Sequence, residues 1–249
     1  MSYTIAEEFV LPSKGLVYGR TVNPNVKLRS MTTVEEMKRL SPSERQYKNL
    51  CEVIDDCLVE KPGISAYDMC LADYQYLLHK LRIVTYGSSY RIMTACPGCG
   101  FTHEVNMNLD SFTVTEYEEH MKDELTFTLP QTKKEVTIRL QTPRMIDDIN
   151  AKVNERKKKA KGATIDNTLS LTIQHLIHSV DGVKLDAVKI EDFVNDLPMM
   201  DTNYIIKKAE KLVERFGLNP YEEEVCPLCG LVYDNYFRLT SEFFGPSVD

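Results

Sequence analysis

Apolar residues recur at helical spacing in several segments, and these segments predict most of the secondary structure. Leu50, Val53, Ile54, Cys57 and Leu58 lie one to four residues apart in the pattern expected for one face of an amphipathic helix. The same spacing predicts helices over 67–85, 169–180, 190–197 and 202–216. We therefore expect a mostly helical protein.

Residues that cap helices mark where several of these helices begin. Thr32 or Thr33 can cap a helix whose first turn contains the acidic pair Glu35–Glu36. The sequence Ser-Pro-Ser-Glu over Ser41–Glu44 predicts a second cap, with Pro at the first helical position. Thr142–Pro143 predicts the start of another helix in the same way.

Alternating apolar and polar residues predict a smaller amount of β-structure. Val26–Arg29 forms one such run, and 125–129 and 135–140 flank a turn in the manner of a β-hairpin. Two more strand-like runs, 101–105 and 231–235, each follow a Cys-rich motif. The predicted fold class is therefore α+β, mostly helical.

Four of the seven Cys residues form two copies of the motif Cys-Pro-x-Cys-Gly, at Cys96 and Cys99 and at Cys226 and Cys229. Two thiolates two residues apart can hold one metal ion, and the following Gly permits the positive φ of a tight turn. Two such motifs predict one tetrahedral Zn²⁺ site. Iron uses the same four-thiolate set, so Fe stays possible. Redox dithiols and inert thiols are the alternatives to a metal site.

The other three Cys residues, Cys51, Cys57 and Cys70, lack this spacing, and we expect them to be buried as small apolar side chains. The two Cys motifs are farther apart than the ligand pairs of a zinc finger. The fold must therefore bring them together.

The chain also contains a diverged internal duplication. Val26–Arg29 resembles Val136–Arg139, and Asp73–Lys80 resembles Asp201–Lys208. In both copies an aromatic-Gly pair stands the same distance before the Cys motif. We expect two strand-helix-helix-knuckle-strand repeats joined at a zinc-ribbon-like four-Cys site, where "knuckle" denotes the Cys motif. A closed site of this kind is structural and not catalytic.

The expected domain organisation follows from the repeated segments and the two Cys motifs. Residues 1–25, rich in Pro and Gly, form an N-terminal arm. Residues 26–115 form the first repeat with the first knuckle, and residues 116–249 form the hairpin and the second repeat with the second knuckle. The apolar residues of the arm are expected to anchor in a partner surface, and the candidate partner-binding residues are Phe9, Leu11, Leu16 and Tyr18.

Charge and missing motifs exclude several functions. The formal charge of −7 opposes a protein that coats nucleic acid, although residues 156–161 form one basic run. We expect no membrane span and no export signal, because no apolar run is long enough. The sequence contains no Gly-rich phosphate loop, nucleophile elbow or zinc-protease motif. His175 and His178 have no carboxylate placed beside them in sequence, and we expect no catalytic role and no enzyme.

The N-terminal sequence Leu11–Tyr18, the strand and helix start at Val26–Thr33, and the first Cys motif together resemble the baseplate hub assembly proteins of T-even-type contractile-tailed bacteriophages. The resemblance is strongest through about residue 110. It implies a non-enzymatic protein of virion morphogenesis that acts with hub subunits and the tape-measure protein. It further implies assembly in the host cytoplasm, and leaves open whether the chain is retained in the virion tail baseplate.

Two functions from other classes stay open at this stage. A zinc-ribbon module that binds nucleic acid or associates with transcription would use the same Cys motifs, but the acidic charge opposes it. A thiol redox enzyme would need a depressed thiolate pKa and a disulfide substrate.

Overall fold

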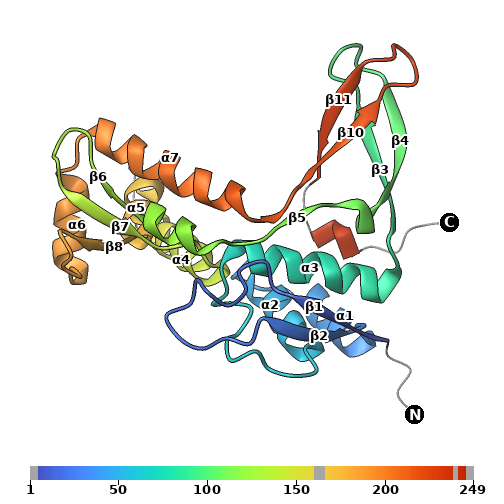
Figure 1. Ribbon diagram of the computed structural model, residues 1–249, viewed down its shortest axis with the longest axis horizontal. Coiled ribbons are helices and arrows are strands. Elements are labelled where there is room, and N and C mark those ends of the chain that lie inside the picture. Colours follow the sequence, from blue (N-terminus) through green and yellow to red (C-terminus); the bar gives the residue numbers. More distant parts are fainter. Residues whose placement is uncertain (1–4, 160–165, 238–240, 245–249) are drawn as a thin grey trace.

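The computed structural model describes residues 5–159, 166–237 and 241–244 (Figure 1). Two helical bodies lie side by side, and two long β-hairpins project together from one end of the molecule. Each body has its own hydrophobic core. No helix in the described ranges is long and apolar enough to cross a bilayer.

The first body contains two strands and three helices, which are β1 (Ala6–Val10), β2 (Asn25–Arg29), α1 (Thr33–Leu40), α2 (Lys48–Cys57) and α3 (Leu71–Tyr86). The strands β1 and β2 pair in antiparallel register, with Phe9 opposite Val26. The predicted cap of α1 is confirmed: Thr32 accepts a hydrogen bond from the backbone of the first turn, and the Glu35 side chain bonds back to Thr32.

The second cap, predicted at Ser41–Glu44, is wrong, because α2 begins only at Lys48. The Ser43 hydroxyl bonds to the backbone of Arg45 in a local turn instead. The Tyr47 backbone N–H donates to the Asp147 carboxylate at 3.1 Å. These contacts hold the segment outside the helix.

The second body contains three strands and four helices, which are β6 (Thr126–Thr128), β7 (Glu135–Ile138), β8 (Ile177–Val180), α4 (Pro143–Lys159), α5 (Thr168–Leu176), α6 (Ala187–Asn195) and α7 (Met199–Arg215). The predicted hairpin is confirmed as β6 and β7. The helix predicted over 169–180 ends four residues early, at Leu176. From Ile177 the chain pairs with β7 instead, and Ile177 and Val180 are buried there.

The projecting hairpins are β3 (Ser89–Ala95) with β4 (Thr102–Asn108), and β10 (Tyr221–Val225) with β11 (Val232–Tyr236). The sequence predicted only the strand after each Cys motif, whereas each motif in fact connects two paired strands. Short elements connect the hairpins with the bodies along the chain: η1 (Leu109–Ser111), β5 (Val114–Thr115), η2 (Glu119–Leu125) and β9 (Gly217–Leu218). A last short helix, η3 (Ser241–Phe244), comes after the second hairpin. The observed class is mixed α/β with small sheets.

The N-terminal segment packs against the first body over most of its described length. Strand β1 forms within it, and Leu11, Ser13 and Val22 are buried. The division into an arm, residues 1–25, and two repeats, 26–115 and 116–249, stays a prediction. Residues 1–4 of the arm and 160–161 of the basic run lie outside the described residues.

Candidate metal centre

The first Cys motif forms the tight turn between β3 and β4. The backbone N–H of Gly100 donates to the carbonyl of Cys96 at 2.9 Å, and the N–H of Cys96 donates to the carbonyl of Phe101 at 2.9 Å. Gly100 has φ of 73°. A side chain at this position would be strained, which explains the Gly after the second Cys.

The second motif repeats this geometry between β10 and β11. The N–H of Gly230 donates to the carbonyl of Cys226, and that of Cys226 donates to the carbonyl of Leu231, each at 2.9 Å. Gly230 has φ of 71°. The turn predicted from the sequence therefore forms twice with the same hydrogen bonds.

The fold brings the four Cys side chains together at the hairpin tips. The Sγ atoms of Cys96 and Cys229 lie 3.7 Å apart, as do those of Cys99 and Cys226. All four Sγ atoms lie within 4.8 Å of one another. Four sulfurs about 2.3 Å from one tetrahedral metal would lie about 3.8 Å apart. The spacing therefore fits a four-coordinate ion, and the cluster could hold one.

The electrostatics of the cluster also suit a cation. The backbone N–H of Cys229, and then that of Leu228, lower the pKa of the Cys226 thiol to about 6. For Cys99, the N–H of Phe101 lowers the pKa, but desolvation and the neighbouring thiols outweigh it and raise the pKa to about 12. Four thiolates this close repel one another, and a divalent ion removes that repulsion.

Behind the cluster, polar side chains line the space between the hairpins. Thr94 faces Asn235 at 3.4 Å, and the Tyr233 hydroxyl lies 3.5 Å from Nε2 of His103. His103 and Tyr233 each stand four residues after the second Cys of their motif, so this contact joins equivalent positions of the two hairpins. Leu231 also packs against Gly98 at the tips, and Tyr90 packs edge-on against Phe237 at the base of the hairpins, with ring centroids 5.6 Å apart. A metal at the tips would add to this attachment between the two hairpins.

The other candidate residues lie away from this cluster. His175 is on α5, where its Nδ1 bonds to the Leu171 carbonyl at 2.8 Å, and His178 is exposed on β8. Cys51, Cys57 and Cys70 are buried as expected, and burial raises the pKa of each thiol. Within the described ranges, the four-Cys cluster is the only group of three or more His, Cys, Asp or Glu placed to share an ion.

The candidate partner-binding residues occupy different environments. Leu11 is fully buried, and Phe9 packs edge-on against Tyr76 with ring centroids 6.4 Å apart. The Tyr18 hydroxyl donates to Asp73 at 2.6 Å. Leu16, at 47% exposure, is the member of this group most available to a partner. Partner binding by these residues stays a prediction.

The protein is a mixed α/β fold in which two hairpins bring four thiols close enough to hold a metal ion. The chain is a member of the T4 bacteriophage base plate protein family, whose profile matches residues 3–245. Neither the curated proteins nor the solved structures gave a match. Family membership supports a structural or assembly role in the phage baseplate, and suggests a non-enzymatic protein of the virion tail that contacts other baseplate proteins.

Proposed function

We propose that this chain acts without catalysis in assembly of the central hub of the tail baseplate, through contacts with hub subunits and the tape-measure protein. The observation that carries the proposal is the family match over residues 3–245. The N-terminal motif and the strand that follows it point to the hub within that family. Assembly in the host cytoplasm is part of the proposal.

We further propose that Cys96, Cys99, Cys226 and Cys229 hold one structural Zn²⁺, with Fe as the other candidate ion. The sulfur spacing and the two matching turns support this. All four positions of a tetrahedral ion would be filled by thiolates, which leaves none for water or substrate. The ion would hold the hairpins in a fixed relative position and so present a rigid surface to partners.

Paired contacts in the two bodies support the proposed duplication. Leu28 of β2 bridges to Leu58, directly after α2, and Ile138 of β7 pairs with Ile177, directly after α5. Strand β1 precedes β2 as β6 precedes β7. If β1 and β6 are equivalent, the first repeat begins at β1 and includes much of the segment assigned to the arm.

The experiment is affinity purification of a tagged full-length chain from infected cells, followed by mass spectrometry. Hub subunits and the tape-measure protein should be enriched over a tagged unrelated phage protein. Enrichment of RNA polymerase or of nucleic acid, lost at high salt, would instead indicate the zinc-ribbon alternative. Mass spectrometry of purified particles then shows whether the chain is retained in the virion.

A further inference from the structure

A groove of about 590 Å³ lies between α5 and α7 and reaches the base of β11. Its surface is mostly apolar, and Leu169 is 42% exposed within it, so the groove is open to solvent. The apolar residues that line it are Leu169, Leu176, Ile206, Ala209 and Val213, together with the aromatic Tyr236 of β11. The second body therefore presents an apolar hollow beside its longest helices.

The corresponding face of α3 in the first body is covered. Extending the match between Asp73–Lys80 and Asp201–Lys208 by two residues places Arg82 of α3 where α7 has Glu210. Arg82 is fully buried, whereas Glu210 is exposed. The short helix η3 packs on α3, and Nε of Arg82 donates to the carbonyl of Phe243 at 3.0 Å (Figure 1). The C-terminal part of the chain thus closes this face of the first body.

Two adjacent aromatic residues of η3 make this closure. Phe243 and Phe244 are both fully buried. The guanidinium of Arg82 lies 5.9 Å from the centre of the Phe243 ring, and that of Arg39 lies 5.6 Å from the centre of the Phe244 ring. The first body therefore receives an aromatic pair on a short helix, beside two cations. No element in the described ranges closes the equivalent face of the second body.

The sign of the charge is reversed at the groove of the second body. Glu210 and Glu214 line it, and among the described residues no Lys, Arg or His does. Neither carboxylate forms an ion pair with any residue that the structure describes. Lys211 and Arg215 of α7 line the next hollow instead, where Arg215 bonds to Glu124 at 2.6 Å. Like charges four residues apart on a helix repel each other, so a cation placed beside them is favoured.

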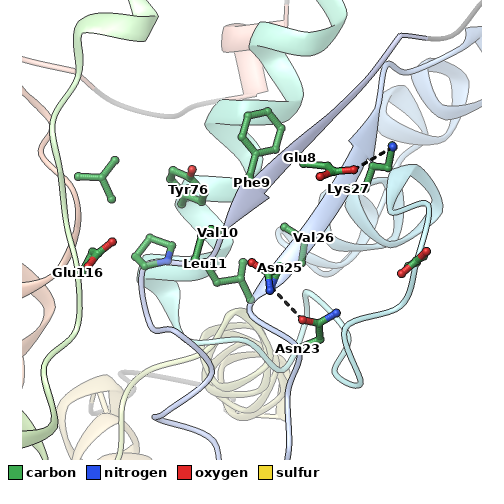
Figure 2. A pocket seen from close by; sticks show the side chains of 13 residues that line it. Glu8, Phe9, Val10, Leu11, Asn23, Asn25, Val26, Lys27, Tyr76 and Glu116 are labelled. Atoms are coloured by element: carbon green, nitrogen blue, oxygen red, sulfur yellow. Dashed lines mark hydrogen bonds and ion pairs between the residues drawn. The ribbon is translucent and has the colours of Figure 1, made fainter.

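The groove beside β1 does not select an occupant by charge in this way (Figure 2). Glu8 and Lys27 both line that groove and pair with each other at 3.1 Å. Glu116, which also lines it, pairs with Lys14 at 2.6 Å. Most of its carboxylates are therefore matched by cations of the same chain, unlike those between α5 and α7.

We propose that the groove between α5 and α7 binds a short helical segment of a partner protein, which carries two adjacent aromatic residues flanked by Lys or Arg. The aromatic pair would lie in the groove as Phe243 and Phe244 lie in the first body, and the cations would lie beside Glu210 and Glu214. The proposal names a partner class for the proposed assembly role, and rests on that role only for the existence of a partner.

The C-terminal segment of a second copy fits the groove less well. Its Phe243 and Phe244 are already buried in their own first body, so a move to another copy gains no apolar burial. Its sequence, Ser-Glu-Phe-Phe, also brings a further negative charge, Glu242, to a groove that has two unpaired carboxylates. A cationic partner segment reverses the sign of that interaction.

The test uses the full-length protein and a fluorescein-labelled peptide, Ala-Lys-Ala-Ala-Lys-Phe-Phe-Lys-Ala-Ala-Lys-Ala. Two matched control peptides replace either every Lys by Glu or both Phe by Ala. Fluorescence anisotropy at low salt should show binding of the first peptide and at least tenfold weaker binding of each control. Methyl NMR locates the bound peptide: resonances of Ile206 and Val213 should shift, and those of Ile54, buried in the first body, should not.

Variants separate the charge contribution from the apolar contribution. Glu210→Lys combined with Glu214→Lys should reverse the preference, so that the Glu peptide binds more tightly than the Lys peptide. Glu44→Lys, at an exposed position outside the groove, should keep the wild-type preference. Leu169→Ser should weaken binding of the Lys peptide at least fivefold, whereas Leu16→Ser, of similar exposure but outside the groove, should change it less than twofold. Circular dichroism verifies that each variant is folded.

Three outcomes would overturn the proposal: no binding of the Lys peptide, equally tight binding of either control peptide, or equal binding by all folded variants. Sedimentation that shows a dimer abolished by Leu169→Ser would assign the groove to a second copy and also overturn it. If the wild type binds no peptide while hub subunits still co-purify with it, only this proposal fails. If the peptide binds in the groove and hub subunits do not co-purify, the groove proposal holds and the hub assignment fails.

Discussion

Asp73 and Asp201 occupy the third positions of α3 and α7, and each is fully buried and accepts hydrogen bonds from the backbone of a distant loop. The N–H of Ser13 donates to Asp73 at 2.9 Å. The N–H groups of Gln131 and Thr132 donate to Asp201 at 2.8 and 2.9 Å. Burial acts to raise the pKa of Asp201, but these donors outweigh it and the pKa is lowered.

The two loops have a common local sequence. Leu11–Pro12 precedes the loop bound by Asp73, and Leu129–Pro130 precedes the loop bound by Asp201; both Leu side chains are fully buried. Each carboxylate thus holds the turn of a β-hairpin against the start of a long helix. This shared arrangement is what a duplication that includes β1 and β6 would produce.

Replacement of Asp201 should destabilise the protein substantially. Asp201→Ala leaves the N–H groups of Gln131 and Thr132 without their acceptor, at a cost of about 3 kcal/mol. Asp234→Ala, at an exposed position of β11, should change stability by less than about 0.5 kcal/mol. Urea unfolding of both variants measures the difference, and equal midpoints would show that the buried carboxylate contributes nothing to stability.

The N-terminal segment offers a matched pair of Leu residues. Leu11→Ala should cost about 2–5 kcal/mol, because Leu11 is fully buried in the first core. Leu16→Ala should cost less than about 0.5 kcal/mol, because Leu16 is 47% exposed. Thermal unfolding measures both. If Leu11→Ala melts like the wild type, the segment behaves as an arm that is separate from the core.

The local sequence was sufficient to predict features stabilised by neighbouring residues. The start of α1 follows from Thr32 and Glu35, whose capping bonds lie within one helical turn. The turn at each Cys motif follows in the same way from the Gly after the second Cys. The meeting of the four sulfurs was also predictable, because each Cys motif supplies only two of the four thiolates that a tetrahedral metal site needs.

Features that depend on distant residues were not predictable in this way. Ile177 continues a helical pattern in sequence, yet β7 captures it as a strand, because pairing opposite Ile138 buries it. The burial of Leu11 and Ser13 depends on contacts with α3 that a Pro- and Gly-rich sequence does not reveal. Strand β1 was equally hidden, since its residues were expected to belong to a loop-rich arm.

Loss of the metal should separate the two hairpins. Cys226→Ser leaves an incomplete ligand set, and metal-binding free energy is coupled to folding. We expect the variant to lose stoichiometric Zn. Amide hydrogen exchange should become faster in both hairpins, β3–β4 and β10–β11, and the melting temperature should fall by several degrees. Metal analysis by mass spectrometry, hydrogen exchange and calorimetry provide the three measurements.

Chelation gives the control for this variant. Wild-type protein treated with a strong chelator should resemble Cys226→Ser, and added Zn²⁺ should restore the wild type but not the variant. If the wild type contains neither Zn nor Fe in stoichiometric amount, or if its melting temperature is insensitive to chelation, the structural metal is ruled out.

The Glu35 carboxylate should make stability depend on pH in the acidic range. A hydrogen bond from Arg29, 2.7 Å long, is the largest cause that lowers its pKa from 4.5 to about 2, and bonds from Thr32 add to it. Because the folded-state pKa lies below the unfolded value, the stabilisation is present above about pH 4.5 and is lost as the pH falls toward 2. Glu35→Gln should therefore cost on the order of 1–2 kcal/mol at pH 7 and clearly less at pH 2.5.

Other carboxylates titrate in the same range, so the comparison needs Glu44→Gln, an exposed residue without an ion pair among the described residues. Urea unfolding of both variants and the wild type at the two pH values gives the difference, and a Glu35→Gln cost that is unchanged by pH would mean that the ion pair with Arg29 does not stabilise the fold.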